Sequence, residues 1–217
     1  MLELAVKTLV AYLLGSLMGA LILGAFRGVD IRTQGSGNAG GTNALRTQGK
    51  AFALGVIVID VAKGWFAAAI LPALALPGLA ADPALARDWL AVACAMAATA
   101  GHVWPVWFEF RGGKGAATVI GVILGIAPTL LPALLGVWLL VVMITGFVGL
   151  GTMLGVAALP VAILLRSPAD PALLAFAVVI AAFVVYTHRS NIQRMLAGNE
   201  NRARKLWLVG RLRARAG

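Results

Sequence analysis

Apolar stretches of similar length alternate with short polar connections along this chain of 217 residues. A helix crosses a bilayer with about 17 to 25 apolar residues, whereas a membrane β-barrel would show alternating strands of about ten. The pattern therefore predicts an all-α integral membrane protein, a bundle of seven short or tilted spans. The predicted spans are 2–26, 51–76, 88–108, 115–127, 129–147, 149–166 and 170–187.

Residues 115–187 are compatible with two arrangements. At 1.5 Å per residue they form about 110 Å of helix, which is between three and four crossings of a core about 30 Å thick. Four short or tilted spans fit this length, and so do two spans with a re-entrant pair. We adopt four spans, which gives seven in all.

Composition supports a membrane protein without a soluble second domain. Hydrophobic residues make up 61% of the chain and charged residues 12%. The mean hydropathy is +0.93, which a soluble domain of this length would find hard to sustain. We expect residues 1–217 to form a single transmembrane domain.

The basic residues predict which side of the membrane each connection faces. The formal net charge is +10, and most Lys and Arg lie after the first span, around residues 109–114 and in the tail after Thr187. The positive-inside rule then places the N-terminus outside and the C-terminus in the cytoplasm, which requires an odd number of spans. The charge also favours membrane lipids with anionic head groups. Nucleic acid is not an expected partner, because the charge lies at membrane edges.

Cysteine and acidic residues give no support for a metal or another cofactor. The single cysteine, Cys94, lies inside an apolar stretch, which excludes a disulfide within the chain. The eight acidic residues are dispersed, so the sequence predicts no cluster that holds a divalent cation.

The first polar stretch, GSGNAGGTNALR at 35–46, favours anion binding. Its glycines match G-x-G-x-x-G, but no strand precedes them, so a dinucleotide fold is not indicated. Closely spaced glycines can turn successive N–H groups toward an anion, and Arg46 can add a fixed charge. The alternative is a flexible loop that caps the next helix. Uncharged donors come from Ser36, Asn38, Thr42 and Asn43.

The second stretch, GHVWPVWFEFRGGKGAAT at 101–118, combines an aromatic belt with a glycine turn. Trp104 and Trp107 are typical of a membrane interface. A Walker A loop is excluded because Phe108 stands where its first glycine is required. A Gly-Gly turn, Lys114 and a helix start nevertheless favour bound phosphate.

The third stretch, HRSNIQRMLAGNE at 188–200, follows the last span. His188 and Asn191 share a helical face and can point toward one site. The alternative is a histidine that only forms hydrogen bonds at the membrane interface.

Two further patterns concern helix packing. Asp60 and Lys63 lie inside an apolar stretch, where buried charges are costly, so we expect a contact one helical turn apart; a role in orienting the adjoining polar loop is the functional alternative. Glycines four apart at 15–19 and 121–125 are expected to let helices approach closely.

Taken together, GSGNAGGTNALR, DVAKG (60–64), GHVWPVWFEFRGGKGAAT and HRSNIQRMLAGNENR (188–202) resemble the bacterial membrane glycerol-3-phosphate acyltransferases that use acyl phosphate. The resemblance implies transfer of a fatty acyl group to the 1-hydroxyl of glycerol 3-phosphate, giving lysophosphatidic acid and inorganic phosphate in phospholipid synthesis. It also implies a multi-pass protein of the bacterial inner membrane, with its active site facing the cytoplasm. We expect a monomer without a cofactor.

Motifs and resemblance together assign the site. The expected catalytic residues are Ser36, Arg46, Lys114, His188 and Asn191. The expected substrate-phosphate-binding residues are Gly37, Asn38, Gly40, Thr42, Asn43, Gly112, Gly113, Thr118, Arg194 and Glu200. One departure concerns a family S-x-x-S pair, for which this chain has Gly149 and Thr152. A phosphate contact from the first of those serines is therefore not expected here.

An acyl phosphate is already activated, so positioning and charge stabilisation can suffice for the transfer. We expect the turn at 36–38 and Lys114 to hold the acyl-phosphate head, and Arg46, His188 and Asn191 to position glycerol 3-phosphate. The proton of the attacking hydroxyl can go to His188 or to a phosphate oxygen of the donor. An acyl-serine is less favoured, because no histidine neighbours Ser36 in the sequence.

Three other mechanisms have less support in the sequence. A transporter of phosphorylated anions would need more polar residues in the membrane than Asp60 and Lys63. A metal-dependent phospho-alcohol transferase would need clustered aspartates. The H-x-x-x-x-D arrangement of other glycerolipid acyltransferases is absent at His102 and at His188, so the sequence does not support a His-Asp dyad.

Overall fold

The computed structural model describes residues 1–166 and 170–216, and within them every regular element is a helix. The chain divides into two compact units, Met1–Pro128 (unit 1) and Thr129–Gly217 (unit 2), and each is described by itself. The predicted all-α class is confirmed for the described residues.

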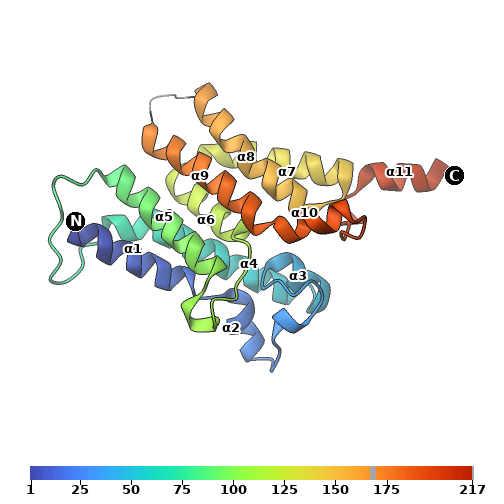
Figure 1. Cartoon of the computed structure of the whole chain (residues 1–217), viewed down its shortest axis with the longest axis horizontal. Coiled ribbons are helices and arrows are strands. Elements are labelled where there is room, and N and C mark those ends of the chain that lie inside the picture. Colours follow the sequence, from blue (N-terminus) through green and yellow to red (C-terminus); the bar gives the residue numbers. More distant parts are fainter. Residues whose placement is uncertain (167–169, 217) are drawn as a thin grey trace. The chain divides into compact units, whose positions relative to one another are not determined.

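Unit 1 is built from two packed helix pairs. α1 lies beside α5, and α4 lies beside α6 (Figure 1). The helices are α1 (Leu2–Gly15), α2 (Gly19–Ala25), α3 (Gly41–Thr47), α4 (Lys50–Trp65), α5 (Arg87–Val103) and α6 (Ala116–Ile126). Shorter helical turns are η1 (Ile31–Thr33), the π-helical η2 (Phe66–Ile70), η3 (Leu71–Ala73) and η4 (Val106–Phe108), and η5 (Pro128–Leu130) begins at the end of this unit.

Glycines allow these helices to pack with their backbones in contact. A Cβ added to Gly15 of α1 would lie 2.1 Å from the carbonyl oxygen of Ala98 in α5. A Cβ added to Gly121 of α6 would lie 2.0 Å from the carbonyl oxygen of Val61 in α4. Because backbone atoms cannot move aside, only glycine fits at either position. The prediction that these glycines serve close helix approach is confirmed.

The helix axis bends by 49° between α1 and α2. At this break a buried ion pair forms hydrogen bonds with backbone groups. Lys63 Nζ lies 2.9 Å from Asp60 Oδ1, which confirms the contact predicted one turn apart. Lys63 also donates to the carbonyl of Leu17 at 2.9 Å, and the N–H of Gly19 donates to Asp60 at 3.3 Å. Backbone groups that the break removes from the helical pattern therefore find partners inside the protein, as a membrane interior requires.

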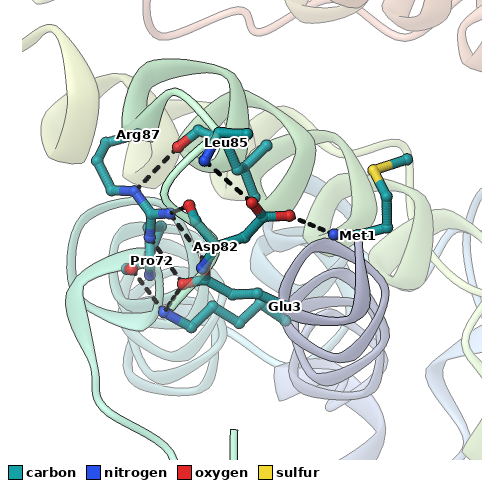
Figure 2. A network of polar contacts seen from close by, with 8 residues as sticks. Met1, Glu3, Pro72, Asp82, Leu85 and Arg87 are labelled. Atoms are coloured by element: carbon teal, nitrogen blue, oxygen red, sulfur yellow. Dashed lines mark hydrogen bonds and ion pairs between the residues drawn. The ribbon is translucent and has the colours of Figure 1, made fainter. Parts of the chain in front are cut away.

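A second polar network lies at the start of α1 (Figure 2). The buried carboxylate of Glu3 accepts from Arg87 at 2.7 and 2.8 Å, from the N–H of Asp82 at 2.8 Å, and pairs with Lys7 at 2.9 Å. The amino group of Met1 donates to Asp82 and lowers the pKa of that carboxyl. These bonds fasten the connection between α4 and α5 to the start of α1.

Unit 2 consists of α7 (Leu131–Thr145), α8 (Val148–Arg166), α9 (Pro171–Thr187), α10 (Arg189–Leu196) and α11 (Leu208–Ala216). α8 packs against both α7 and α9, and α10 contacts α8 and α9. The axis bends by 53° between α9 and α10. His188 lies at this bend and is both the C-cap residue of α9 and the N-cap residue of α10.

Among the described residues, four helical stretches are long and apolar enough to cross a membrane, or up to six if each bent pair counts as one span. The four are Lys50–Ala73, Arg87–Phe108, Pro128–Thr145 and Val148–Arg166. α6 is apolar but has only 11 residues, about half the thickness of a bilayer core. The predicted stretch at 115–127 is thus helical, while the count of seven spans stays a prediction.

Candidate active site

The loop between α2 and α3 is folded around the side chain of Asn43, which is 1% exposed. Asn43 Oδ1 accepts from the N–H of Ser36 at 3.0 Å. Asn43 Nδ2 donates to the carbonyls of Ile31 at 3.2 Å and Gln34 at 3.0 Å. A buried amide with three hydrogen bonds to one loop fixes the shape of that loop. Asn43 was expected to bind phosphate, and in the structure it holds the residues beside it.

Glycines make this fold of the loop possible. Gly35 and Gly37 have φ of +57° and +71°, a conformation that favours glycine. A Cβ added to Gly35 would lie 2.3 Å from Asn43 Oδ1. The N–H of Gly37 donates to the carbonyl of Gln34 at 3.0 Å, so two of the N–H groups expected to face an anion, those of Ser36 and Gly37, bond within the loop.

The next N–H groups are the better candidates for holding an anion. Among the described residues, the N–H groups of Asn38, Ala39 and Gly40 find no acceptor. The side chain of Asn38 folds over Gly40, where an added Cβ would lie 2.7 Å from Asn38 Nδ2. The segment therefore presents consecutive backbone donors together with an amide.

Arg46 and Thr42 are exposed on α3, four residues apart and so on one face of the helix. Arg46 makes no ion pair with any described residue. An exposed guanidinium beside a rigid loop that offers amide donors is an arrangement suited to a phosphate ester.

The second predicted loop turns back onto the end of α5. The N–H of Gly112 donates to the carbonyl of Val103 at 3.2 Å, and that of Gly113 donates to His102 at 3.1 Å. Gly115, with φ of +87°, caps the start of α6. Lys114 is half-buried within this turn. The backbone bonds directly before the lysine and the helix start directly after it restrict where its ammonium group can reach.

Thr118, expected to bind phosphate, is buried in the packing of α6 against α4. Its side chain is inaccessible to solvent, and Oγ1 has no partner among the described residues. A Cβ added to Gly64 of α4 would lie 2.3 Å from the carbonyl oxygen of Thr118. Its predicted contact with phosphate stays a prediction.

An arginine that the sequence analysis did not assign to the site connects the two loops. Arg32 pairs with Asp30 at 2.8 Å and donates to the carbonyl of Phe108 at 3.0 Å. Hydrogen bonds from Arg32 lower the pKa of Asp30, and the carboxylate in turn raises the pKa of Arg32. Glu109 and Phe110, directly after this carbonyl, have φ of 59° and 57°, which is costly for residues other than glycine.

The only sequence signal for this connection is Asp-x-Arg at the start of a turn. The Asp30 side chain accepts from the N–H of Arg32 at 2.9 Å, which is a common cap for a short helix. That signal is weak, because many loops begin this way. The partner of Arg32 in the second loop could be found only in three dimensions.

In unit 2 the bend between α9 and α10 orients His188, which is 4% exposed. Its Nδ1 lies 2.8 Å from the carbonyl oxygen of Val184 and 3.3 Å from Oγ1 of Thr187. A carbonyl can only accept, so Nδ1 carries the proton in this bond. In the neutral imidazole Nε2 is then the basic nitrogen, as a proton acceptor for a hydroxyl requires.

Glu200 joins two of the other predicted residues. Asn191 Nδ2 donates to Glu200 Oε1 at 2.9 Å, and Arg194 Nε lies 2.5 Å from Glu200 Oε2. An anionic carboxylate repels phosphate, so we do not expect Glu200 to contact the substrate phosphate directly. We interpret Glu200 as a residue that holds Asn191 and Arg194 in place.

The two positions that depart from the S-x-x-S pattern both lie in α8. A Cβ added to Gly149 would lie 2.8 Å from Asn191 Nδ2, so Asn191 occupies the space that a side chain would need. Thr152 donates to the carbonyl of Val148 within the helix at 3.0 Å. Gly149 has no side-chain hydroxyl, and the hydroxyl of Thr152 is already bonded within its own helix.

Within each unit the structure connects some of the predicted residues, whereas their binding of substrate stays a prediction. In unit 1 Arg32, just before the glycine loop, donates to the carbonyl of Phe108, six residues before Lys114, and Arg46 follows the glycine loop on α3. In unit 2 Glu200 joins Asn191 and Arg194, and His188 precedes them at the bend between α9 and α10. Among the described residues, no group of three or more His, Cys, Asp or Glu side chains is placed to share a metal ion. The joint action of residues from the two units stays a prediction.

Comparison with known proteins gives one consistent result. Residues 5–198 match the sequence profile of the family described as glycerol-3-phosphate acyltransferase. The glycerol-3-phosphate acyltransferase of Chlorobaculum parvum is 39% identical over 217 residues, covering 89% of this chain and 93% of that protein. The one from Clostridioides difficile is 44% identical over 195 residues, covering 89% and 92%.

Two crystal structures also match. PlsY (YgiH), an integral membrane glycerol 3-phosphate acyltransferase, superposes in its glycerol 3-phosphate form with a TM-score of 0.79 at 32% identity, covering 92% of this chain and 94% of that one. Its lysophosphatidic acid form gives a TM-score of 0.76 at the same identity and coverage.

Proposed function

Because this chain belongs to the glycerol-3-phosphate acyltransferase family, we propose that it transfers a fatty acyl group from acyl phosphate to the 1-hydroxyl of glycerol 3-phosphate. The products are lysophosphatidic acid and inorganic phosphate. The family itself supports the acceptor. The choice of donor rests on the resemblance of the motifs and on a site rich in groups that bind phosphate.

One observation carries this proposal. Arg46 is exposed on the helix that follows a loop fixed by Asn43, and Arg32 connects that loop to Phe108, in the segment that leads to Lys114. Two cations with adjacent backbone donors suit a reaction in which both substrates carry a phosphate group. In a membrane protein such an assembly also keeps anions at the edge of the hydrocarbon.

In the proposed reaction, the loop at 36–38 and Lys114 hold the acyl-phosphate head, while Arg46, His188 and Asn191 position glycerol 3-phosphate. The hydroxyl oxygen attacks the acyl carbon and forms the ester bond, and the bond from that carbon to the phosphate oxygen breaks. The hydroxyl proton passes to Nε2 of His188 or to a phosphate oxygen of the donor. Held geometry and fixed positive charge supply the rate enhancement.

The membrane arrangement is part of the same proposal. The chain has seven spans, of which α6 is the shortest. The N-terminus lies outside and the basic tail lies in the cytoplasm. The reaction therefore takes place at the inner face of the bacterial inner membrane. Residues 1–217 act as one acyltransferase domain. The protein works as a monomer without a cofactor.

The test uses detergent-purified full-length protein, palmitoyl phosphate and glycerol 3-phosphate, with EDTA present. We expect release of inorganic phosphate that requires glycerol 3-phosphate and equals the lysophosphatidic acid formed. Palmitoyl-CoA in place of palmitoyl phosphate should give no product. Folded protein that releases no phosphate, or releases it without forming lysophosphatidic acid, would overturn the proposal.

A further inference from the structure

His102 is a buried histidine that the proposed reaction does not use. It lies in the last turn of α5 and is 2% exposed, so it does not meet a substrate in solution. Its Nδ1 lies 3.6 Å from Asp60 Oδ1 of α4. No H-x-x-x-x-D arrangement predicts a His-Asp pair in this chain, but the fold brings together a histidine and an aspartate that lie far apart in the sequence.

The carboxylate of Asp60, next to this ring, is itself held in place. It is bound by Lys63 and by the N–H of Gly19, and Lys63 is itself bound to the carbonyl of Leu17. Among the described residues, Asp60 Oδ2 and His102 Nδ1 have no hydrogen-bond partner. A shift of well under 1 Å would bring the ring nitrogen within hydrogen-bonding distance of the carboxylate and satisfy buried atoms that are otherwise costly.

The other edge of the ring supports the glycine turn. A Cβ added to Gly113 would lie 2.2 Å from His102 Nε2 and 3.1 Å from both neighbouring ring carbons, so Gly113 rests directly against this nitrogen. The backbone of the same histidine accepts from the N–H of Gly113 at 3.1 Å. Both the ring and the backbone of His102 therefore locate the residue that precedes Lys114.

We infer that His102 is a positioning residue for Lys114. Asp60 orients the imidazole, the imidazole supports Gly113, and the turn from Gly112 to Gly115 then holds the lysine where it meets a substrate phosphate. The role of Lys114 in this inference rests on the proposed function. Support of this kind has a large effect, because a misplacement of about 1 Å can cost about 10²-fold in rate.

The test compares His102→Phe, which keeps a ring but removes both nitrogens, with Lys114→Ala and with the double variant. We expect His102→Phe to raise the KM for at least one of the two phosphate substrates by about tenfold, with a smaller change in kcat. In the Lys114→Ala background the same change should have little further effect, because the lysine that it positions is gone. Asp60→Asn should shift the KM in the same direction.

Cys94→Ala is the matched control, since it is also a buried change in α5 but lies two turns from the loop. It should lower the melting temperature in detergent and leave the KM unaltered. An unchanged KM in His102→Phe overturns the inference. The inference is also overturned if the double variant changes the KM by the product of the two single changes, because a general loss of structure would act independently of the lysine.

A binding measurement separates this inference from the proposed reaction. Calorimetric titration with glycerol 3-phosphate, and separately with inorganic phosphate, needs no turnover. If the protein transfers no acyl group, yet Lys114→Ala and His102→Phe weaken binding of either probe without adding to each other, the reaction is wrong and the positioning role stands. If turnover is normal and neither KM nor binding responds to His102→Phe, the positioning role is wrong.

Discussion

The N–H of Ser36 donates to Oδ1 of Asn43 at 3.0 Å, across a separation of seven residues. This bond closes the glycine loop onto the first turn of α3. It also explains why Gly35 is glycine, since a Cβ there would lie 2.3 Å from the same oxygen. The position of Ser36 therefore depends on a side chain that need not touch substrate.

Asn43→Asp tests this dependence. The substitution keeps the acceptor but replaces two donated bonds, to Ile31 and Gln34, with a carboxylate oxygen facing two carbonyls. We expect a loss of about 1–3 kcal/mol in stability and at least about a tenfold fall in kcat/KM. Thermal unfolding in detergent and steady-state kinetics measure both. Asn201→Asp makes the same chemical change at an exposed position and should alter neither; normal kcat/KM in Asn43→Asp would show that the loop does not need this amide.

Arg46→Ala removes an exposed guanidinium without disturbing an ion pair. If its charge stabilises the transition state, kcat/KM should fall by about 10² or more, whereas the melting temperature should hardly change. Lys50→Ala is the control, because Lys50 is an exposed cation in the same connection. Equal kinetics for the two variants would remove Arg46 from the site. The decisive quantity is the ratio of their kcat/KM values.

The hydrophobic pattern predicted the helical class and the approximate extent of the long apolar helices, but not where helices break. The break at 16–18 depends on Asp60 and Lys63, which bind Leu17 and Gly19 from a different helix. The bend at His188 similarly separates α9 from α10 in a region that reads as apolar followed by polar. Such breaks depend on contacts between distant residues, which hydropathy does not record.

For the candidate site, the sequence predicts which segments bind substrate, but it does not indicate which side chains are bound within the protein. Asn43 and Glu200 were expected to bind phosphate, but their hydrogen bonds go to the protein itself. Arg32 was counted only as a cytoplasmic charge, although it connects two loops. A donor-rich motif looks the same in the sequence whether its donors face a ligand or the protein, because that choice depends on tertiary packing.

The hydrogen bond from His188 Nδ1 to the carbonyl of Val184 predicts the effect of replacing the ring. Asparagine can still donate from the place of Nδ1 but has no basic nitrogen in the place of Nε2. If Nε2 takes the hydroxyl proton, His188→Asn should lower kcat by about 10². A decrease of less than about threefold would instead assign the proton to a phosphate oxygen of the donor. Single-turnover kinetics would exclude product release as the step observed.

The close contact between Gly149 and Asn191 allows a test of whether activity depends on the position of the Asn191 amide. Gly149→Ala adds a Cβ at 2.8 Å from Asn191 Nδ2 and should displace the amide from Glu200. We expect kcat/KM to fall about tenfold. Gly136→Ala in α7 is the control, because a Cβ there would have no atom within 4 Å. That control should keep full activity and gain up to about 1 kcal/mol from helix propensity. Equal activity of the two variants would show that Asn191 is not needed where it lies.

The pairing of Asp30 with Arg32 makes loop stability depend on pH. Because Arg32 lowers the pKa of Asp30 below its unfolded value, the pair stabilises the fold fully above the ordinary aspartate pKa. This contribution is lost as the pH falls through the folded-state pKa of Asp30. We therefore expect the melting temperatures of the wild type and of Arg32→Gln to respond alike between pH 7 and about pH 5, and that of the wild type to fall more steeply on acidification below about pH 4.

The same variant should also affect catalysis at neutral pH. Without Arg32, the carbonyl of Phe108 loses its donor next to Glu109 and Phe110, whose backbone is already strained. The Lys114 turn should then be held less firmly, and the KM for a phosphate substrate should rise several-fold. Lys50→Gln removes an exposed charge from the same connection and should change neither the pH profile nor the KM. Parallel melting curves for the wild type and Arg32→Gln, together with an equal KM, would mean that the two loops keep their positions without this arginine.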